Sequence, residues 1–354
     1  MTIVHVTGAR PNFPKMAPVE RALRLLGARQ KVVHTGQHFD RNLSSLFFEQ
    51  LSIPSPDVNL GVGGGSHAIQ TASIMTAIEP VFETERPSLV MVYGDVNSTV
   101  AATLVASKMG IAVAHVEAGL RSGDRSMPEE LNRLVVDSIA DVLFTTSEDA
   151  SENLLREGVD AGRIHFVGNS MIDSLMANRQ FFSVPDFVAG IGAPYALVTL
   201  HRPGNVDNPT DADAIAIMLS ELATELPVVF PVHPRSWAVL AERGVMDHPR
   251  IMATGPMGYL EFMGTMSGAR LVVTDSGGVQ EETTILGVPC FTVRPNTERP
   301  VTIILGTNQL ASRSDVVSRV RAELSEPALE RPVPPLWDGR AGERIADIVF
   351  ARNS

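Results

Sequence analysis

The chain has 354 residues, of which 44% are hydrophobic and 19% charged, a composition that is ordinary for a globular protein and excludes a disordered one. Asp and Glu residues number 40 against 29 Lys and Arg residues, and the resulting net charge of −11 argues against general nucleic-acid binding. Its single cysteine, Cys290, excludes an internal disulfide and a metal site built from several thiolates.

In the first half of the chain, short apolar runs alternate with longer runs of helical period. The runs that we expect to form strands are Thr2–Thr7, Lys31–Thr35, Leu89–Tyr93, Ile111–Val116, Asp141–Thr145 and Arg163–Val167. Helical patterns between them include Met16–Leu26, Ile69–Glu85 and Glu129–Ala140. Strands that are apolar throughout, each followed by a helix, are typical of a buried parallel sheet.

The second half repeats this arrangement. Its expected strands are Tyr195–Leu200, Val228–Val232, Leu271–Thr274 and Val288–Val293, and its expected helices include Asp211–Leu226 and Gly277–Leu286. Residues 181–194 show no sustained period, so the domain junction should lie near them. A last helix is expected around Ile345, Ile348 and Val349. The pattern predicts an α/β protein of two doubly wound domains in tandem.

Polar and glycine-rich residues follow nearly every expected strand. Arg10 and Lys15 follow the first strand, Asp95 the third and Glu117 the fourth, while His201 follows the first strand of the second half. Ligands of open α/β sheets bind beyond the carboxyl ends of the strands. Two such edges that face one another would form one active-site cleft between the domains.

The segment DSGGVQEE at 275–282 is the strongest anion-binding signal. A strand followed by Ser276, Gly277, Gly278 and a helix leaves backbone N–H groups free at the helix start, which suits a phosphate or diphosphate. A plain helix cap with a glycine turn explains the same residues about equally well. Arg294 and Arg299 should lie near the same region.

Several carboxylates could act in proton transfer. Asp95 and Glu117 directly follow apolar strands, and Glu129 and Glu130 open a helix after Pro128. A carboxylate in a poorly solvated cleft acquires the raised pKa that acid–base work requires. Acidic residues are also common in a first helical turn for electrostatic reasons alone, so the Glu129–Glu130 pair is ambiguous.

The chain resembles the non-hydrolysing UDP-N-acetylglucosamine 2-epimerases over essentially its whole length. The motifs that carry the resemblance are GARPNFPKMAPV (8–19), TGQH (35–38), YGDVNST (93–99), HVEAGLRSGD (115–124), MPEELNR (127–133), VTLHRPGNVD (198–207), DSGGVQEE (275–282) and TERP (297–300). The resemblance implies a GT-B fold of two Rossmann-like domains, with the last helix crossing back to the first domain. The first domain would then comprise residues 1–172 and 340–354, and the second residues 173–339.

The resemblance also implies a reaction and a set of site residues. The reaction is reversible inversion at sugar carbon 2 of a UDP-sugar, through elimination of UDP to a 2-acetamidoglucal and its re-addition, without a metal or another cofactor. Matched motif by motif, the implied catalytic residues are Asp95, Glu117, Glu129 and His201. The implied UDP-sugar contacts are Arg10, Lys15, Arg202, Phe262, Ser276, Gly277, Gly278, Glu282 and Arg299.

Alternatives to this reaction remain open. The protein could act on a modified UDP-acetamido sugar, or hydrolyse its product to N-acetylmannosamine and UDP. A GT-B glycosyltransferase or a UDP-sugar sensor without catalysis would share the fold. The resemblance implies a homodimer, and because the sequence has neither a signal peptide nor a membrane-length apolar run, we expect a cytoplasmic protein with no membrane or nucleic-acid partner.

Overall fold

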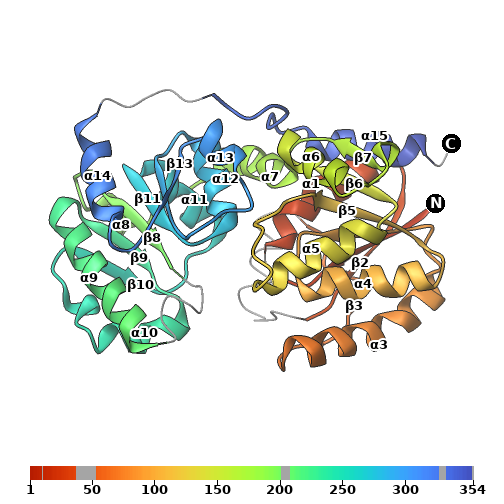
Figure 1. The fold of residues 1–354 in the computed structure, drawn as a ribbon, viewed down its shortest axis with the longest axis horizontal. Helices are drawn as coiled ribbons and strands as arrows, with labels where there is room; N and C mark the ends of the chain where they lie inside the picture. Colours follow the sequence, from red (N-terminus) through yellow and green to blue (C-terminus); the bar gives the residue numbers. More distant parts are fainter. Residues whose placement is uncertain (10, 37–52, 201–207, 327–331, 353–354) are drawn as a thin grey trace. The chain divides into compact units, whose positions relative to one another are not determined.

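The computed structural model describes residues 1–9, 11–36, 53–200, 208–326 and 332–352 of the chain, without the side chain of residue 235. The chain divides into two compact units, and its end returns to the first of them. Unit 1 comprises Met1–Arg179 and Pro335–Ser354, and unit 2 comprises Gln180–Pro334. Each unit contains a parallel sheet wrapped by helices (Figure 1). Among the described residues, no helix is both long and apolar enough to cross a membrane.

Unit 1 is built on a seven-stranded sheet in the order β3-β2-β1-β4-β5-β6-β7. Its strands are β1 (Thr2–Thr7), β2 (Arg29–His34), β3 (Val58–Asn59), β4 (Leu89–Tyr93), β5 (Ala112–Ala118), β6 (Val142–Thr145) and β7 (Ile164–Phe166). Its helices are α1 (Asn12–Leu25), α3 (His67–Glu85), α4 (Asn97–Lys108), α5 (Pro128–Ile139), α6 (Glu148–Arg156), η1 (Ala161–Arg163), α7 (Ser170–Asn178) and α15 (Ala341–Ala351). Helices α3, α4 and α5 pack side by side in that order (Figure 1).

Unit 2 repeats the same strand order on a six-stranded sheet, β10-β9-β8-β11-β12-β13. Its strands are β8 (Ala196–Thr199), β9 (Val228–Pro231), β10 (Ile251–Thr254), β11 (Leu271–Thr274), β12 (Cys290–Val293) and β13 (Asn308–Ala311). Its helices are α8 (Asp186–Ala189), α9 (Pro209–Glu225), α10 (Pro234–Ala241), η4 (Val245–Asp247), α11 (Tyr259–Gly268), α12 (Gly277–Leu286), α13 (Val301–Ile304) and α14 (Val316–Ser325). The short helix η2 (Arg179–Phe181) spans the junction with unit 1.

Both sheets are fully parallel, so the prediction of two doubly wound α/β units is confirmed. The central strands β4 and β11 are buried along their whole length, as expected for a sheet covered on both faces. Three strands, β3, β10 and β13, were not predicted. Strand β3 has only two residues and β13 begins with Asn308 and Gln309, so neither presents the apolar run on which the prediction depended.

The chain end is fixed to unit 1 by side-chain and backbone contacts. Helix α15 packs against α1 and α7 (Figure 1). The carboxylate of Asp173 on α7 accepts hydrogen bonds from the backbone N–H groups of Ala341 (3.2 Å) and Gly342 (2.7 Å). A Cβ at Gly342 would lie 2.7 Å from the carbonyl oxygen of Pro18, so only glycine allows α15 to approach α1 this closely. The expected return of the last helix to the first unit is confirmed.

Candidate functional site

In each unit the strand order reverses direction between two central strands, β1 and β4 in unit 1 and β8 and β11 in unit 2. Chain connections leave such a pair of strands toward opposite faces, which opens a crevice at their carboxyl ends. The segments that follow these four strands hold most of the site residues predicted from the sequence. Of these residues, Arg10, His201 and Arg202 lie outside the described part of the chain.

The carboxyl ends of β1 and β4 are joined by the side chain of Asn12. Its Oδ1 atom accepts hydrogen bonds from the N–H groups of Gly8 (3.1 Å) and Ala9 (3.0 Å), and its amide donates to the carbonyl of Tyr93 (2.8 Å). The loop after β1 is therefore fixed to the end of β4, and Lys15 lies one turn further along α1. Sequence reasoning missed Asn12, although it stands in the quoted GARPNFPK motif.

Lys15 and Glu117 form a buried ion pair between α1 and β5. Their side chains are only 8% and 6% exposed, so each charge depends on the other for its stabilisation. A Cβ at Gly94 would lie 3.0 Å from Nζ of Lys15 and 3.2 Å from Oε2 of Glu117. The backbone after β4 therefore lies directly against the pair.

Glu117 has an unusual backbone conformation for a side chain with a Cβ. Its φ angle is +74°, in the left-handed region, and the register of β5 with β6 shifts between Val116 and Ala118. Bulges of this kind redirect a side chain at the end of a strand. A left-handed non-glycine residue costs of order 1–2 kcal/mol and persists only where surrounding contacts enforce it.

Asp95 is held by an arginine that the sequence analysis did not single out. Arg133 on α5 forms an ion pair with Asp95, and its guanidinium also contacts Oε2 of Glu130 (2.5 Å). Arg133 is almost fully buried, whereas the Asp95 side chain is 27% exposed. Arg133 thus links the carboxylate of Glu130 to the carboxylate of Asp95.

Glu129 and Glu130 are neighbours with different surroundings. Glu130 accepts hydrogen bonds from the N–H groups of Ser122 (3.0 Å) and Gly123 (2.9 Å) as well as from Arg133. Burial pushes its pKa upward, but these donors outweigh burial and hold the pKa of Glu130 below its usual range. Glu129 is half-exposed in the first turn of α5, and no hydrogen bond or ion pair of its side chain involves a described residue. Glu130 therefore supports the loop, and Glu129 is available to a ligand.

In unit 2, the start of α12 has the features of an anion site. Ser276 stands at the N-cap, but its side chain makes no capping hydrogen bond to the helix, so the plain-cap interpretation does not account for its hydroxyl. A Cβ at Gly277 would lie 2.5 Å from Nη1 of Arg299. The guanidinium group thus lies directly against the first turn of α12, beside Gly277 and Gly278.

Arg299 is oriented by two buried carboxylates. It forms ion pairs with Glu298 and, at 3.1 Å, with Glu281 on α12, and Glu298 also binds Arg294 at 2.8 Å. All four side chains are at least nine-tenths buried. Charges in such surroundings hold fixed positions, because any movement would leave one of them unpaired. Glu298 was not predicted as a site residue.

Glu282 lies on the same helix in a less polar environment. Burial raises the pKa of Glu282 to about 8, and the nearby Glu281 carboxylate adds to the shift. The shift persists only while no donor reaches the carboxylate, so a ligand hydroxyl or amide that bonds to Glu282 would favour its ionised form.

The predicted site residue Phe262 is half-buried on α11.

The structure thus joins Lys15 with Glu117 in unit 1 and Ser276, Gly277, Gly278 and Arg299 in unit 2. A further cavity of about 910 Å³ lies in unit 2 between α9 and residues 310–315, and its lining includes Arg294, which the sequence placed near the anion-binding segment. In the described part of the chain, no group of three or more His, Cys, Asp or Glu side chains is arranged to hold a metal ion.

Comparison with known proteins identifies the relatives of the chain. The sequence profile of the family described as UDP-N-acetylglucosamine 2-epimerase matches residues 23–350. The UDP-N-acetylglucosamine 2-epimerase of Methanocaldococcus jannaschii is 40% identical over 363 residues, covering 99% of both chains. The UDP-2,3-diacetamido-2,3-dideoxy-D-glucuronate 2-epimerase of Pseudomonas aeruginosa is 40% identical over 353 residues, covering 98% of this chain and 99% of the relative.

A solved structure supports the same conclusion. The crystal structure of the M. jannaschii UDP-GlcNAc 2-epimerase in complex with UDP-GlcNAc and UDP superposes with a TM-score of 0.91 at 39% identity, covering 99% of this chain and all of that one. Its similarity confirms the GT-B class expected from the sequence. The chain belongs to the UDP-N-acetylglucosamine 2-epimerase family.

Proposed function

We propose that the protein catalyses the reversible 2-epimerisation of UDP-N-acetylglucosamine to UDP-N-acetylmannosamine. Family membership supports this reaction, and the observation that carries it is the presence of a buried Lys15–Glu117 ion pair in unit 1 and of an anion site at the start of α12 in unit 2. The first can act on the sugar and the second can hold the diphosphate.

The chemistry follows from the position of the proton that must move. The carbon 2 hydrogen has no adjacent carbonyl to acidify it, so a base removes it while the bond from carbon 1 to the diphosphate oxygen breaks. The C–H electron pair becomes the carbon 1–carbon 2 double bond, and the C–O pair leaves with UDP. Protonation at carbon 2 on the opposite face, with return of the UDP oxygen to carbon 1, gives the epimer.

The proton leaves carbon 2 on one face of the sugar and returns on the opposite face, so the reaction requires a proton carrier on each face. We propose Asp95, Glu117, Glu129 and His201 for this work, each able to contribute about 10²–10⁴ in rate. Glu117 forms an ion pair with Lys15, and Asp95 forms one with Arg133. The side chain of Glu129 is half-exposed and makes no hydrogen bond or ion pair with a described residue, so it can approach a ligand.

The departing UDP gains negative charge as the C–O bond breaks. We propose that Ser276, Gly277 and Gly278 hold the diphosphate at the start of α12, where N–H groups and the helix dipole favour an anion. Arg299 beside Gly277 would add a fixed positive charge. Glu282 and Phe262 would hold the uridine, and Arg10, Lys15 and Arg202 would complete the substrate contacts.

Proton NMR of the protein with UDP-GlcNAc in heavy water tests the proposal. UDP-ManNAc carrying deuterium at carbon 2 is the expected product. Free ManNAc with UDP would move the protein to hydrolysing epimerases, and the absence of both exchange and product would overturn UDP-GlcNAc as the substrate. Release of UDP only when an acceptor sugar is added would instead indicate a glycosyltransferase.

A modified sugar is a second candidate substrate. The 2-epimerase of P. aeruginosa that acts on a UDP-diacetamido-glucuronate is as similar to this chain as the M. jannaschii enzyme. Comparison of kcat/KM for the two UDP-sugars decides between them. A ratio of about ten or more in favour of UDP-2,3-diacetamido-2,3-dideoxy-D-glucuronate would reassign the substrate.

The adjacent glutamates offer a matched test of the site. Glu129→Gln should reduce kcat by about 10²-fold or more without changing the free energy of unfolding, because its carboxylate makes no hydrogen bond or ion pair with a described residue. Glu130→Gln should lower stability by roughly 1–3 kcal/mol, since it weakens the bonds to Ser122, Gly123 and Arg133. Full activity of Glu129→Gln would remove Glu129 from the mechanism.

We also propose that the protein works as a homodimer in the cytoplasm, as the family resemblance implies. Light scattering of the purified chain should give twice the monomer mass. A monomer with full activity would contradict this part of the proposal.

A further inference from the structure

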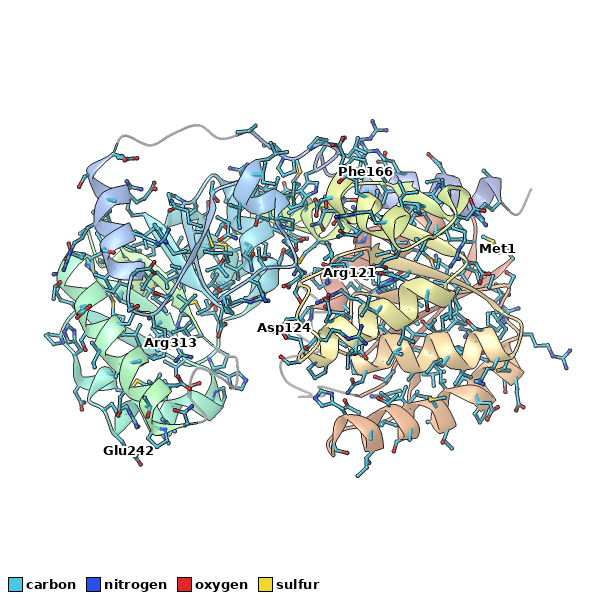
Figure 2. The ribbon with its side chains drawn as sticks, in the orientation of Figure 1. Met1, Arg121, Asp124, Phe166, Glu242 and Arg313 are labelled. Carbon is cyan, nitrogen blue, oxygen red and sulfur yellow. The ribbon has the colours of Figure 1, made fainter. Side chains whose placement is uncertain are left out.

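A buried polar cluster lies behind the two catalytic carboxylates of unit 1. Its members are His115 on β5, Asp137 on α5 and Arg121 (labelled in Figure 2) in the segment between them. His115 and Asp137 are fully buried, and neither was predicted as a site residue. The proposed reaction assigns no proton transfer or ligand contact to any of the three.

Hydrogen bonds join the cluster to the neighbouring backbone. Nε2 of His115 lies 2.8 Å from the carbonyl oxygen of Gly94, and because a carbonyl oxygen only accepts, Nε2 carries a proton. Nδ1 lies 2.6 Å from Oδ1 of Asp137. The other oxygen of Asp137 accepts from the N–H of Gly119 (3.0 Å) and from Nη1 of Arg121 (2.7 Å).

Asp137 is therefore surrounded by donors and remains ionised inside the protein. Burial pushes its pKa upward, but His115 and Arg121 outweigh burial and hold the pKa of Asp137 below its usual range. The 2.6 Å contact between Nδ1 of His115 and this carboxylate gives the pair a fixed geometry.

The two backbone groups bound by this pair, the Gly94 carbonyl and the Gly119 N–H, flank the catalytic carboxylates. Gly94 precedes Asp95, and its N–H donates to the carbonyl of Val116 at 3.0 Å. Gly119 follows Glu117 by two residues. His115 thus fixes the peptide before Asp95, and Asp137 fixes the turn after Glu117.

A positioning device is needed at this point of the chain. The left-handed backbone at Glu117 is unfavourable by itself and has to be enforced by neighbouring contacts. Gly94, whose backbone lies against the Lys15–Glu117 pair, also has a positive φ angle of +64°. The hydrogen bonds of His115 and Asp137 hold both of these turns.

We propose that His115 and Asp137 are positioning residues, whose buried hydrogen-bonded pair holds the peptides beside Asp95 and Glu117 so that both carboxylates reach the sugar. This inference rests on the proposed function, since it assigns these carboxylates to proton transfer. Neither residue touches the substrate.

Substitutions of His115 test the hydrogen bond to Gly94. The amide nitrogen of His115→Gln can take the place of Nε2 and keep the bond to Gly94, whereas that of His115→Asn takes the place of Nδ1 and keeps the bond to Asp137. We expect kcat to fall about 10²-fold in His115→Asn and by less in His115→Gln, because displacement of a catalytic group by about 1 Å costs that much. The dissociation constant of UDP, measured by calorimetry, should change less than twofold, since the anion site lies in unit 2.

Matched variants separate positioning from a general loss of stability. His5→Gln alters another fully buried histidine of the same sheet, bonded to Tyr93 and Gln30, and should keep kcat within about twofold. Asp137→Asn should reduce kcat about as strongly as His115→Asn.

The outcomes distinguish the two proposals. A wild-type protein that neither epimerises a UDP-sugar nor exchanges its carbon 2 proton overturns the proposed function. An active wild type whose His115→Asn and Asp137→Asn variants keep kcat within the range of His5→Gln overturns the positioning role.

Discussion

Because the backbone at Glu117 is left-handed, the Glu117→Gly variant should be more stable than the Glu117→Ala variant. Both Glu117→Ala and Glu117→Gly delete the carboxylate and its ion pair with Lys15, so these losses cancel when the two variants are compared. What differs is the left-handed backbone at φ +74°, which costs alanine about 1–2 kcal/mol. Glycine loses about 0.5–1 kcal/mol through its larger chain entropy. The glycine variant should therefore be more stable by roughly 0.5–1 kcal/mol.

The neighbouring strand residue supplies the control. Val116 has an ordinary strand conformation on β5, so Val116→Gly should be less stable than Val116→Ala by about 0.5–1 kcal/mol. The difference in the free energy of unfolding between the glycine and alanine variants should thus have opposite signs at positions 116 and 117. A general change in packing would not produce this reversal.

The two tryptophans allow the unfolding of unit 1 to be followed separately. Trp337 belongs to unit 1, is 3% exposed and donates to the carbonyl of Thr146, whereas Trp237 lies on α10 of unit 2. In a Trp237→Phe background, the fluorescence of Trp337 during urea titration reports unit 1 alone. If Glu117→Ala proves at least as stable as Glu117→Gly, the backbone at this position is not strained and the argument for enforced positioning fails.

Further predictions concern the anion site, acid stability and the last helix. Gly277→Ala should displace Arg299 and weaken UDP binding at least about tenfold by calorimetry, whereas Gly255→Ala, whose Cβ would meet no atom within 4 Å, should bind normally. Burial lowers the pKa of His5 to about 4 from 6.5, so only the unfolded chain takes up this proton between those values. Urea titrations should therefore show unit 1 losing stability as the pH falls from 6.5 to 4, by up to about 3 kcal/mol from His5, with a smaller loss in His5→Gln. Asp173→Ala removes the hydrogen-bond acceptor at the start of α15, so it should lower the free energy of unfolding by roughly 1–2 kcal/mol. Amide exchange in residues 341–351 should become faster. Unchanged exchange would contradict this account of the chain end.

The local pattern of the sequence determined the architecture of both units. Unbroken apolar strands such as Leu89–Tyr93 identify a sheet buried on both faces, and the helices between them require parallel connections. Since parallel strands end at the same edge of the sheet, the polar residues that follow them could also be placed at that edge. Helix α12 was predicted with its observed bounds, because glycines stand at both of its ends.

Only the tertiary structure decided which groups touch and which conformation each adopts. The Lys15–Glu117 pair joins residues 102 positions apart, and Arg133 reaches Asp95 over 38 positions, so no local pattern could reveal either contact. The left-handed turn at Glu117 carries no glycine to mark it. In the sequence, His115 is indistinguishable from an ordinary residue of an apolar strand. Only the folded chain places Asp137 and the Gly94 carbonyl beside its ring. Periodicity reports which face of an element is buried, whereas the protonation and orientation of a buried polar group depend on partners that only the folded chain assembles.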